Sequence, residues 1–249
     1  VDEHLAGFCS EIQVTLEKDG SATVSDNGRG VPVDMHQKGV SAARLVYTTL
    51  HAGGKFDDSA YKTSGGLHGV GSSVVNALST YMDVQISREG AIHHDRYEQG
   101  RPVIDLVDGL LPVIGKTRKT GTWIHFLPDS EIFEKTRFSG TEVKSRLHET
   151  AYLNPGLTIL YEDKREGSKE KIEYHEPDGI IGFIRDLNKN KETIGDPVYF
   201  KGESDGITVE GAFQYVNEFH ENVLGFCNNI YNAEGGTHLT GFKTTFTGL

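Results

Sequence analysis

The ten residues from Ser64 to Ser73 contain four glycines and are the stretch of this sequence best suited to binding an anion. Glycine has no Cβ atom, so such a backbone can adopt positive φ angles and approach a ligand closely. Residues 74–78 (Val-Val-Asn-Ala-Leu) then predict the first turns of a buried helix. A glycine-rich loop that leads into a helix presents unpaired N–H groups and the positive end of the helix dipole, which favours a phosphate. A flexible loop before a helix is the alternative interpretation of the same residues.

The glycine spacing differs from that of two common phosphate-binding motifs. Gly53-Gly54-Lys55 is followed by Phe56, whereas a P-loop needs Ser or Thr after its lysine. Gly66, Gly69 and Gly71 have the reverse of the G-x-G-x-x-G spacing that binds dinucleotides. The sequence therefore predicts that any bound nucleotide is held by a different fold.

A second candidate for chemistry is Asp26, which begins the heptapeptide Asp-Asn-Gly-Arg-Gly-Val-Pro. The alternating segment 11–17 predicts a half-buried strand, residues 18–20 a hairpin turn and residues 21–25 the returning strand. Asp26 is therefore expected at the mouth of a sheet, where its carboxylate can accept a hydrogen bond from an exocyclic amine such as N6 of adenine. A plain Asp-Asn-Gly turn is the alternative.

The remaining elements up to residue 190 are those that would hold the two candidates in place. Helices are predicted at 41–50, 73–79, 141–152 and 178–188, and strands at 82–88, 91–99, 121–127 and 157–162. The segment 53–71 is expected to form a lid over a bound phosphate chain. His93 and His94 are expected to face solvent rather than a metal, and the charged hairpin 163–171 is expected to be solvated surface.

A change of character near residue 190 predicts a second unit. Residues 188–191 (Asn-Lys-Asn-Lys) are typical of a linker, and alternating segments at 198–200, 207–216 and 222–228 predict the strands of a β-rich unit. A helix is expected to start near Thr240. We therefore expect two domains, residues 1–190 and 191–249.

The bulk composition limits the class of protein. With 36% hydrophobic and 24% charged residues and no apolar run near the ~20 residues that span a bilayer, we expect a soluble protein without a membrane partner. A formal net charge of −11 argues against a surface that itself grips nucleic acid, so any DNA contact is assigned to regions outside this chain. Cys9 and Cys227 are expected to be buried, reduced thiols of a cytoplasmic protein. A start at Val1 instead of Met and an end on Thr-Gly-Leu without a clear stop signal suggest a fragment cut at both ends.

Five short motifs occur in a fixed order along the chain. They are 26–32 (Asp-Asn-Gly-Arg-Gly-Val-Pro), 51–56 (His-Ala-Gly-Gly-Lys-Phe), 64–71 (Ser-Gly-Gly-Leu-His-Gly-Val-Gly), 119–122 (Lys-Thr-Gly-Thr) and 235–238 (Gly-Gly-Thr-His). Each is weak alone, but in this order they resemble the ATPase subunit of bacterial type IIA topoisomerases, the family of DNA gyrase B and its topoisomerase IV counterpart. The resemblance covers essentially the whole chain. Within that family, Ser72-Ser73 favours the topoisomerase IV branch.

The resemblance implies an α+β fold of the GHKL (Bergerat) type, an ATP-binding α/β sandwich in which a mixed sheet carries helices on one face. It implies that residues 191–249 are the first part of a β-rich transducer domain. The implied activity couples ATP binding and hydrolysis to the passage of one DNA duplex through another, with ATP and Mg²⁺ as cofactors. The implied partners are the DNA-cleavage subunit, DNA bound by other regions, a second copy of the ATPase subunit and ATP-competitive inhibitors.

The resemblance also assigns roles to particular residues. Asp26 would receive the adenine amine, directly and through a water that Thr122 supports, and Tyr61 would lie near the adenine. Lys55 would lie near the phosphates. The other ATP-binding positions implied are Gly30, Pro32, Gly66, Leu67, His68, Gly69, Val70, Gly71 and Ser72. The rim that ATP-competitive antibacterials contact would include Glu3, Arg29 and Arg88.

Several groups that the family uses for hydrolysis match no residue of this sequence. The general-base Glu and the Mg²⁺-binding Asn would precede Val1, and the transducer Lys that contacts the γ-phosphate would follow Leu249. Hydrolysis requires a base positioned for water and a metal that offsets developing charge. We therefore expect no catalytic or metal-binding residue in this chain, and binding of adenine-site ligands without turnover.

Two other classes of protein stay open at this point. Another GHKL protein, such as a histidine kinase, a chaperone of the HSP90 type or a mismatch-repair ATPase, would lack the motifs at 51–56 and 235–238. A non-catalytic nucleotide-binding or regulatory module would keep the pocket around Asp26 without the machinery for hydrolysis.

Overall fold

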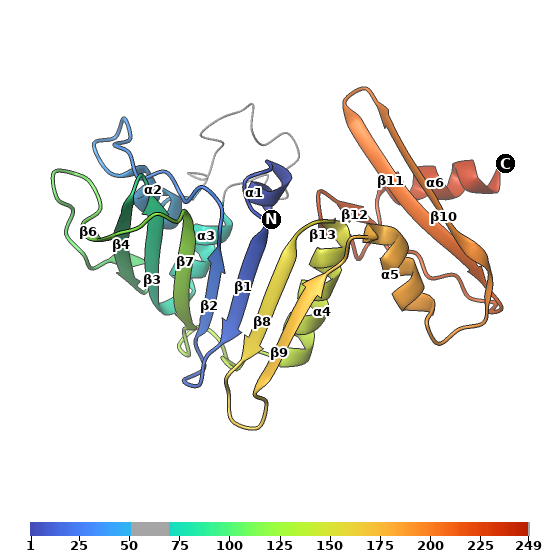
Figure 1. Ribbon diagram of the computed structural model, residues 1–249, viewed down its shortest axis with the longest axis horizontal. Helices are drawn as coiled ribbons and strands as arrows, with labels where there is room; N and C mark the ends of the chain where they lie inside the picture. Colours follow the sequence, from blue (N-terminus) through green and yellow to red (C-terminus); the bar gives the residue numbers. More distant parts are fainter. Residues whose placement is uncertain (51–69, 249) are drawn as a thin grey trace. The chain divides into compact units, whose positions relative to one another are not determined.

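The computed structural model describes residues 1–50 and 70–248 and divides the chain into two compact units, Val1–Glu176 and Pro177–Leu249 (Figure 1). Helix α5 (Gly179–Asn188) belongs to the second unit in this division, whereas the sequence assigned it to the first domain. The expected division into domains 1–190 and 191–249 stays a prediction. No helix in the described part of the chain is long and apolar enough to cross a membrane.

The described part of the first unit is built on one mixed sheet of nine strands. The strands run in the order β5-β4-β3-β7-β2-β1-β8-β9, and β6 also pairs with β4. The strand pairs are antiparallel except for β1 and β8, which are parallel. Their bounds are β1 (Glu11–Leu16), β2 (Ala22–Asp26), β3 (Ser79–Arg88), β4 (Ala91–Glu98), β5 (Arg101–Pro102), β6 (Val113–Lys116), β7 (Gly121–Pro128), β8 (Thr158–Asp163) and β9 (Glu170–His175).

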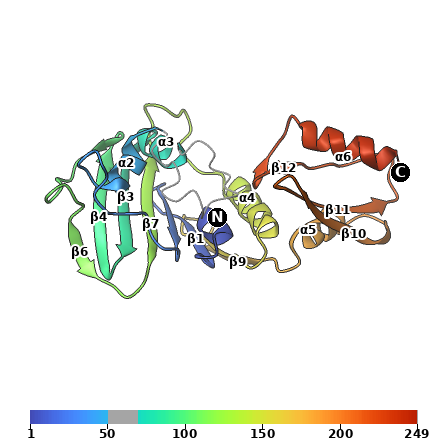
Figure 2. The same cartoon turned by 90° about the horizontal axis from the view of Figure 1, so that it is seen from above.

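Helices of the first unit lie on one face of this sheet, as the resemblance implied (Figures 1 and 2). They are α2 (Ala42–Thr48), α3 (Gly71–Ala77) and α4 (Gly140–Leu153), and a short α1 (Asp2–Leu5) precedes β1. One core cluster packs α2 against β3 and β4, and the other packs α4 against β1 and β8. Phe126 of β7 contacts both clusters, so they form one core on one face, because alternate residues of a strand share a face.

The opposite face of the sheet is polar where β3, β4 and β7 lie side by side. Asp83 pairs with Arg96 at 2.9 Å and with His94 Nε2 at 2.7 Å. The expectation that His93 and His94 face solvent is met only in part, because both residues are half-buried and His94 is held by a carboxylate. Cross-strand pairing on a pleated sheet brings such charged side chains together, which a reading of one strand at a time does not show.

Two further expectations about the surface were wrong. The hairpin 163–171 is not solvated throughout, because Asp163 is only 2% exposed and forms two hydrogen bonds with the Arg165 guanidinium, at 2.9 and 2.7 Å. This pair lowers the pKa of the Asp163 carboxyl well below its usual range. Cys9 is buried as expected, but Cys227 is exposed.

The described part of the second unit combines two helices with two sheets of two strands each. Its elements are α5, β10 (Thr193–Ser204), β11 (Ile207–Val216), β12 (Phe226–Cys227), β13 (Ile230–Tyr231) and α6 (Thr237–Thr247). Helix α5 packs against the β10–β11 hairpin. The expected strand at 222–228 shrinks to β12, because Asn228 and Asn229 adopt positive φ angles and turn the chain. The last helix begins at Thr237, before the expected start at Thr240.

Candidate functional site

Asp26 is the last residue of β2 and lies opposite Ile12 of β1. It follows Ala22 and Val24 at a spacing of two, so it lies on the helix-bearing face of the sheet. Its side chain is half-buried, and Oδ1 accepts a hydrogen bond from the Gly28 N–H at 2.8 Å. Burial raises the pKa of the Asp26 carboxyl above its ordinary value, while the Gly28 and Thr122 backbone N–H groups act against that shift.

This environment leaves the Asp26 carboxylate able to bind a donor. A carboxylate offers about four lone-pair positions, and the Gly28 and Thr122 backbone N–H groups account for two of them. A carboxylate whose charge is poorly solvated gains most from a new hydrogen-bond donor, because that donor replaces lost water. Asp26 can therefore receive an amine from a ligand that enters the mouth of the sheet.

Glycines allow three strands to converge on Asp26. Gly121, the first residue of β7, has φ +144, and a Cβ atom there would lie 2.1 Å from the Asp26 carbonyl oxygen. Gly30 has φ +79, and a Cβ atom there would lie 2.9 Å from the Ser87 carbonyl oxygen. No larger residue fits at Gly121 without moving β2, so this glycine fixes where Asp26 lies. Gly121 belongs to the motif 119–122, but the sequence did not predict that it is part of the site.

Thr122 supports the loop that follows Asp26. It is 8% exposed, and its Oγ1 accepts a hydrogen bond from the Val31 N–H at 3.3 Å. This contact joins β7 to the segment that carries Gly30 and Pro32, two of the positions expected to bind ATP. The expected role of Thr122 in holding a water against adenine stays a prediction.

Asn27 positions the same turn from the other side, and sequence reasoning missed it. Its Oδ1 accepts hydrogen bonds from the backbone N–H groups of Ser10 and Glu11, at 2.9 and 3.0 Å. Its Nδ2 donates to Ser10 Oγ at 2.9 Å. The side chain therefore ties the Asp26 turn to the start of β1. An Asn after a strand is typical of a turn, so only the strand pairing reveals this role.

The three expected rim residues surround this turn. Arg29 donates from Nε and from a terminal nitrogen to the two carboxylate oxygens of Glu3, at 3.0 and 2.8 Å. The Arg29 guanidinium also lies 3.8 Å from the centroid of the Phe8 ring. Arg88, the last residue of β3, donates to the Gly30 carbonyl oxygen at 2.8 Å. Glu3, Arg29 and Arg88 thus lie beside the segment that follows Asp26.

Six of the expected ATP-binding positions lie outside the described residues: Lys55, Tyr61, Gly66, Leu67, His68 and Gly69. Val70 is the residue before α3, and Gly71 and Ser72 begin that helix. The expectation that residues 74–78 face inward was wrong for Val74 and Val75, which are each 37% exposed. Asn76 is buried instead and donates to the Tyr47 carbonyl oxygen at 2.8 Å, which joins α3 to the end of α2.

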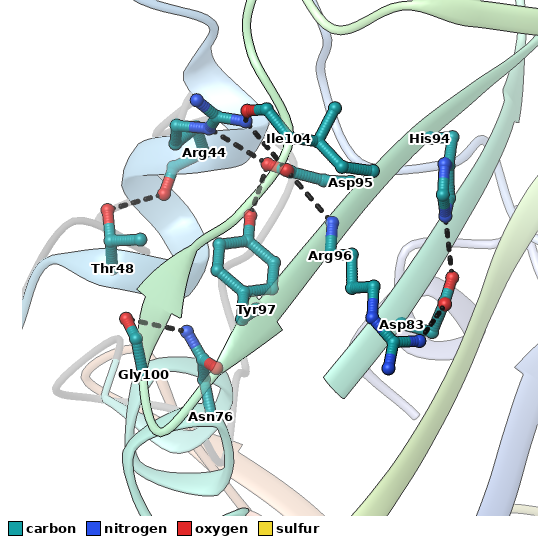
Figure 3. Close-up of polar contacts among 10 residues, drawn as sticks. All are labelled: Arg44, Thr48, Asn76, Asp83, His94, Asp95, Arg96, Tyr97, Gly100 and Ile104. Atoms are coloured by element: carbon teal, nitrogen blue, oxygen red, sulfur yellow. Dashed lines mark hydrogen bonds and ion pairs between the residues drawn. The ribbon is translucent and has the colours of Figure 1, made fainter. Parts of the chain in front are cut away.

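Asp95 on β4 is a second aspartate on the helix-bearing face, with a different set of neighbours (Figure 3). The Arg44 guanidinium donates two hydrogen bonds to its carboxylate, at 3.0 and 2.7 Å. The Tyr97 hydroxyl donates a third at 2.6 Å, and the Arg96 N–H a fourth at 3.0 Å. These four donors leave the Asp95 carboxylate no capacity for a ligand.

The described residues do not form a metal site. No three His, Cys, Asp or Glu side chains in this part of the chain are grouped as metal ligands. The chemistry that the Asp26 site offers is hydrogen bonding to a ligand.

Comparison with known proteins agrees with this geometry. The family model described as "Histidine kinase-, DNA gyrase B-, and HSP90-like ATPase" matches residues 1–132, and the model for DNA gyrase B matches residues 179–249. The DNA gyrase B protein of Streptococcus pneumoniae serotype 4 is 51% identical over 250 residues, which cover 99% of this chain.

The chain belongs to the family of histidine kinase-, DNA gyrase B- and HSP90-like ATPases.

Two further relatives extend the comparison. The DNA gyrase B protein of Archaeoglobus fulgidus is 48% identical over 99% of the chain. The crystal structure of the 43K ATPase domain of Thermus thermophilus gyrase B in complex with an aminocoumarin superposes with a TM-score of 0.81. That match has 36% identity and covers 98% of this chain and 61% of the other. The chain spans 38% and 39% of the length of the two curated relatives. The GHKL fold expected from the motifs is confirmed.

Proposed function

We propose that this chain is the ATP-binding region of a type IIA DNA topoisomerase and that Asp26 receives the exocyclic amine of adenine. The observation that carries the proposal is the state of the Asp26 carboxylate. It is half-buried at the mouth of the sheet, and burial raises its pKa although the Gly28 and Thr122 backbone N–H groups act against that shift.

The rest of the expected site is proposed on the resemblance. Thr122 would hold a water beside the adenine, and Gly30, Pro32 and Tyr61 would line the base. Lys55 and the segment 66–72 would contact the phosphates. The Thermus thermophilus relative was crystallised with an aminocoumarin. On the resemblance, Glu3, Arg29 and Arg88 would form the rim that such an inhibitor contacts.

A finer proposal is that this 249-residue chain binds adenine-site ligands without turning over ATP. The resemblance assigns the general base and the Mg²⁺ ligand to positions that this sequence does not contain. The described residues hold no grouping suited to a metal, so we derive no step through Mg²⁺. Purified chain that releases phosphate from ATP, with release blocked by an aminocoumarin, would contradict this finer proposal.

For the parent enzyme we propose that ATP binding and hydrolysis drive the passage of one DNA duplex through another. It would act as a dimer of this ATPase subunit with a DNA-cleavage subunit, in the cytoplasm where its DNA substrate lies. The relatives named above are gyrases. The indication from Ser72-Ser73 toward the topoisomerase IV branch stays a prediction.

The test of the Asp26 assignment is calorimetry with adenosine and with an aminocoumarin. Asp26→Ala removes a charge-assisted hydrogen bond, so both affinities should fall by about 1.5–3 kcal/mol, or roughly 10- to 150-fold. Asp105→Asn, at an exposed aspartate of the same unit, is the control and should bind both ligands normally. If Asp26→Ala bound both ligands with unchanged affinity, Asp26 would not be the residue that receives the amine.

A further inference from the structure

The end of the sheet that carries Asp26 is rich in cations. β2 and β3 end there at Asp26 and Arg88, and β7 begins there at Gly121, because β2 and β3 are each antiparallel to β7. The connecting segments 26–29, 88–91 and 116–121 contain the cations Arg29, Arg88, Lys116, Arg118 and Lys119 and the anions Asp26 and Glu89. This local excess of positive charge occurs in a chain whose net charge is −11.

Three of these cations form one loop, which we name the basic loop (residues 116–119, Lys-Thr-Arg-Lys). Lys116, Arg118 and Lys119 are exposed, and within the described residues none of them takes part in an ion pair. Arg29 differs, because it is paired with Glu3. The basic loop therefore holds the cations of this end that are available to an incoming anion.

Backbone contacts place the basic loop beside the Asp26 turn. The Thr117 N–H donates to the Gly90 carbonyl oxygen at 3.0 Å, which joins the loop to the turn that follows Arg88. The Lys119 N–H donates to Thr117 Oγ1 at 3.0 Å, which fixes the bend of the loop. Two residues later the chain reaches Gly121, whose Cα lies against the Asp26 carbonyl oxygen.

The other end of the same sheet has the opposite charge balance. There β1 joins β2, β4 ends and β7 ends. The connecting segments 17–20, 98–101 and 128–131 carry the anions Glu17, Asp19, Glu98, Asp129 and Glu131 and the cations Lys18 and Arg101. In these connecting segments the Asp26 end of the sheet is thus basic and the far end acidic, although Glu3 pairs with Arg29 at the first end and Lys164 with Glu17 at the second.

We infer that the basic loop is an electrostatic capture site for the polyphosphate of the nucleotide that enters beside Asp26. The inference rests on the proposed function, because Asp26 would hold the base while the loop attracts the phosphates. An anionic protein repels an anionic ligand at long range, but a local cluster of cations at a cleft concentrates it and raises its association rate. Charges separated by more than about 8–10 Å are screened at 0.1–0.15 M salt, so the loop must lie near the entrance to act.

The experiment compares association rates of a ribose-labelled fluorescent ATP and the matching labelled adenosine, measured by stopped flow in EDTA. In the triple variant Lys116→Gln, Arg118→Gln and Lys119→Gln, the rate for ATP should fall about tenfold at low ionic strength. The rate for adenosine should stay within about twofold, and the loss for ATP should shrink as salt screens the charges. Lys116→Arg with Lys119→Arg keeps the charges and should keep the wild-type rate.

The matched control neutralises three exposed cations outside the basic loop, Lys18, Arg101 and Lys135, and should leave both rates unchanged. An equal loss for ATP and adenosine, or no loss for ATP, would overturn the inference. The inference would also be overturned if the triple variant kept its ATP association rate but lost binding of a fluorescent DNA duplex, because the loop would then be a DNA-binding site. If the unaltered chain bound neither adenosine nor ATP, the proposed function itself would fail.

Discussion

Asp26 and Asp95 lie on the same face of one sheet, yet their surroundings differ in kind. Asp95 is 0% exposed and receives two hydrogen bonds from Arg44 and one each from Tyr97 and the Arg96 N–H. Asp26 is half-buried and its Oδ1 receives a hydrogen bond from the Gly28 N–H. Asp95 is fully buried and has the cation Arg44 beside it. Asp26 is less buried, and the nearby anion Glu3 disfavours its charged form.

The difference is the one expected between a structural carboxylate and the carboxylate that we propose binds a ligand. Burial alone would lower the pKa of Arg44, but the hydrogen bonds and charge of Asp95 outweigh it and raise that pKa. Burial and the nearby Asp95 charge also raise the pKa of the Tyr97 hydroxyl, so Tyr97 stays a donor. Asp95 thus completes a satisfied network within the core. At Asp26 the raised pKa marks a charge that the protein alone does not satisfy.

The largest expected effect is a loss of stability when Asp95 loses the arginine that pairs with it. Arg44→Ala would leave the Asp95 charge buried without its cation, which should lower the free energy of unfolding by about 3–5 kcal/mol. Urea unfolding followed by the fluorescence of Trp123, the one tryptophan of the chain, reports on the first unit. Arg101→Ala, at an exposed arginine of the same unit, should change stability by less than about 0.5 kcal/mol. A loss below about 1 kcal/mol in Arg44→Ala would mean that the network is not structural.

Substitution of Asn for Asp is expected to change the free energy of unfolding in opposite directions at Asp26 and at Asp95, and by less than Arg44→Ala does. Because the folded-state pKa of Asp26 is raised, the folded protein holds that proton more tightly, and stability falls as pH rises through this pKa. Asp26→Asn removes the cost and keeps an oxygen for the Gly28 N–H, so at pH 7 stability should be unchanged or higher by up to about 1 kcal/mol. Asp95→Asn should instead destabilise the protein. Equal destabilisation by Asp26→Asn and Asp95→Asn would contradict the proposed difference between the two aspartates.

The strands that meet at Asp26 could be predicted from the sequence, because each is a short stretch with its own pattern. The roles of Asp26, Arg29 and Arg88 in binding stay predictions of the resemblance. Gly121 could not be assigned in this way, since the need for glycine there comes from the Asp26 carbonyl on another strand. Asn27 escaped for the same reason, because its partners lie at the start of β1.

Errors about burial have a related cause. The charged side chain of Asp163 was assigned to solvent, but its pairing with Arg165 and the packing of Gly140 against that pair enclose it. The valines at 74 and 75 were assigned to the core by composition. The structure buries Asn76 instead, because its amide bonds to the end of α2. Composition predicts the average face of a helix, whereas particular hydrogen bonds decide which residue turns inward.

The most direct measurement of the central claim is the pKa of the Asp26 carboxyl, read by ¹³C NMR titration of the free chain and of the chain saturated with adenosine. In the free chain the pKa should lie above the ordinary aspartate value of about 3.9, because burial disfavours the charge. Adenosine donates an amine hydrogen to the ionised form, so its binding should lower the pKa and weaken as pH falls through the free-chain value. A pKa that adenosine leaves unchanged or raises would contradict the account, because the amine would then not be bound by the Asp26 carboxylate.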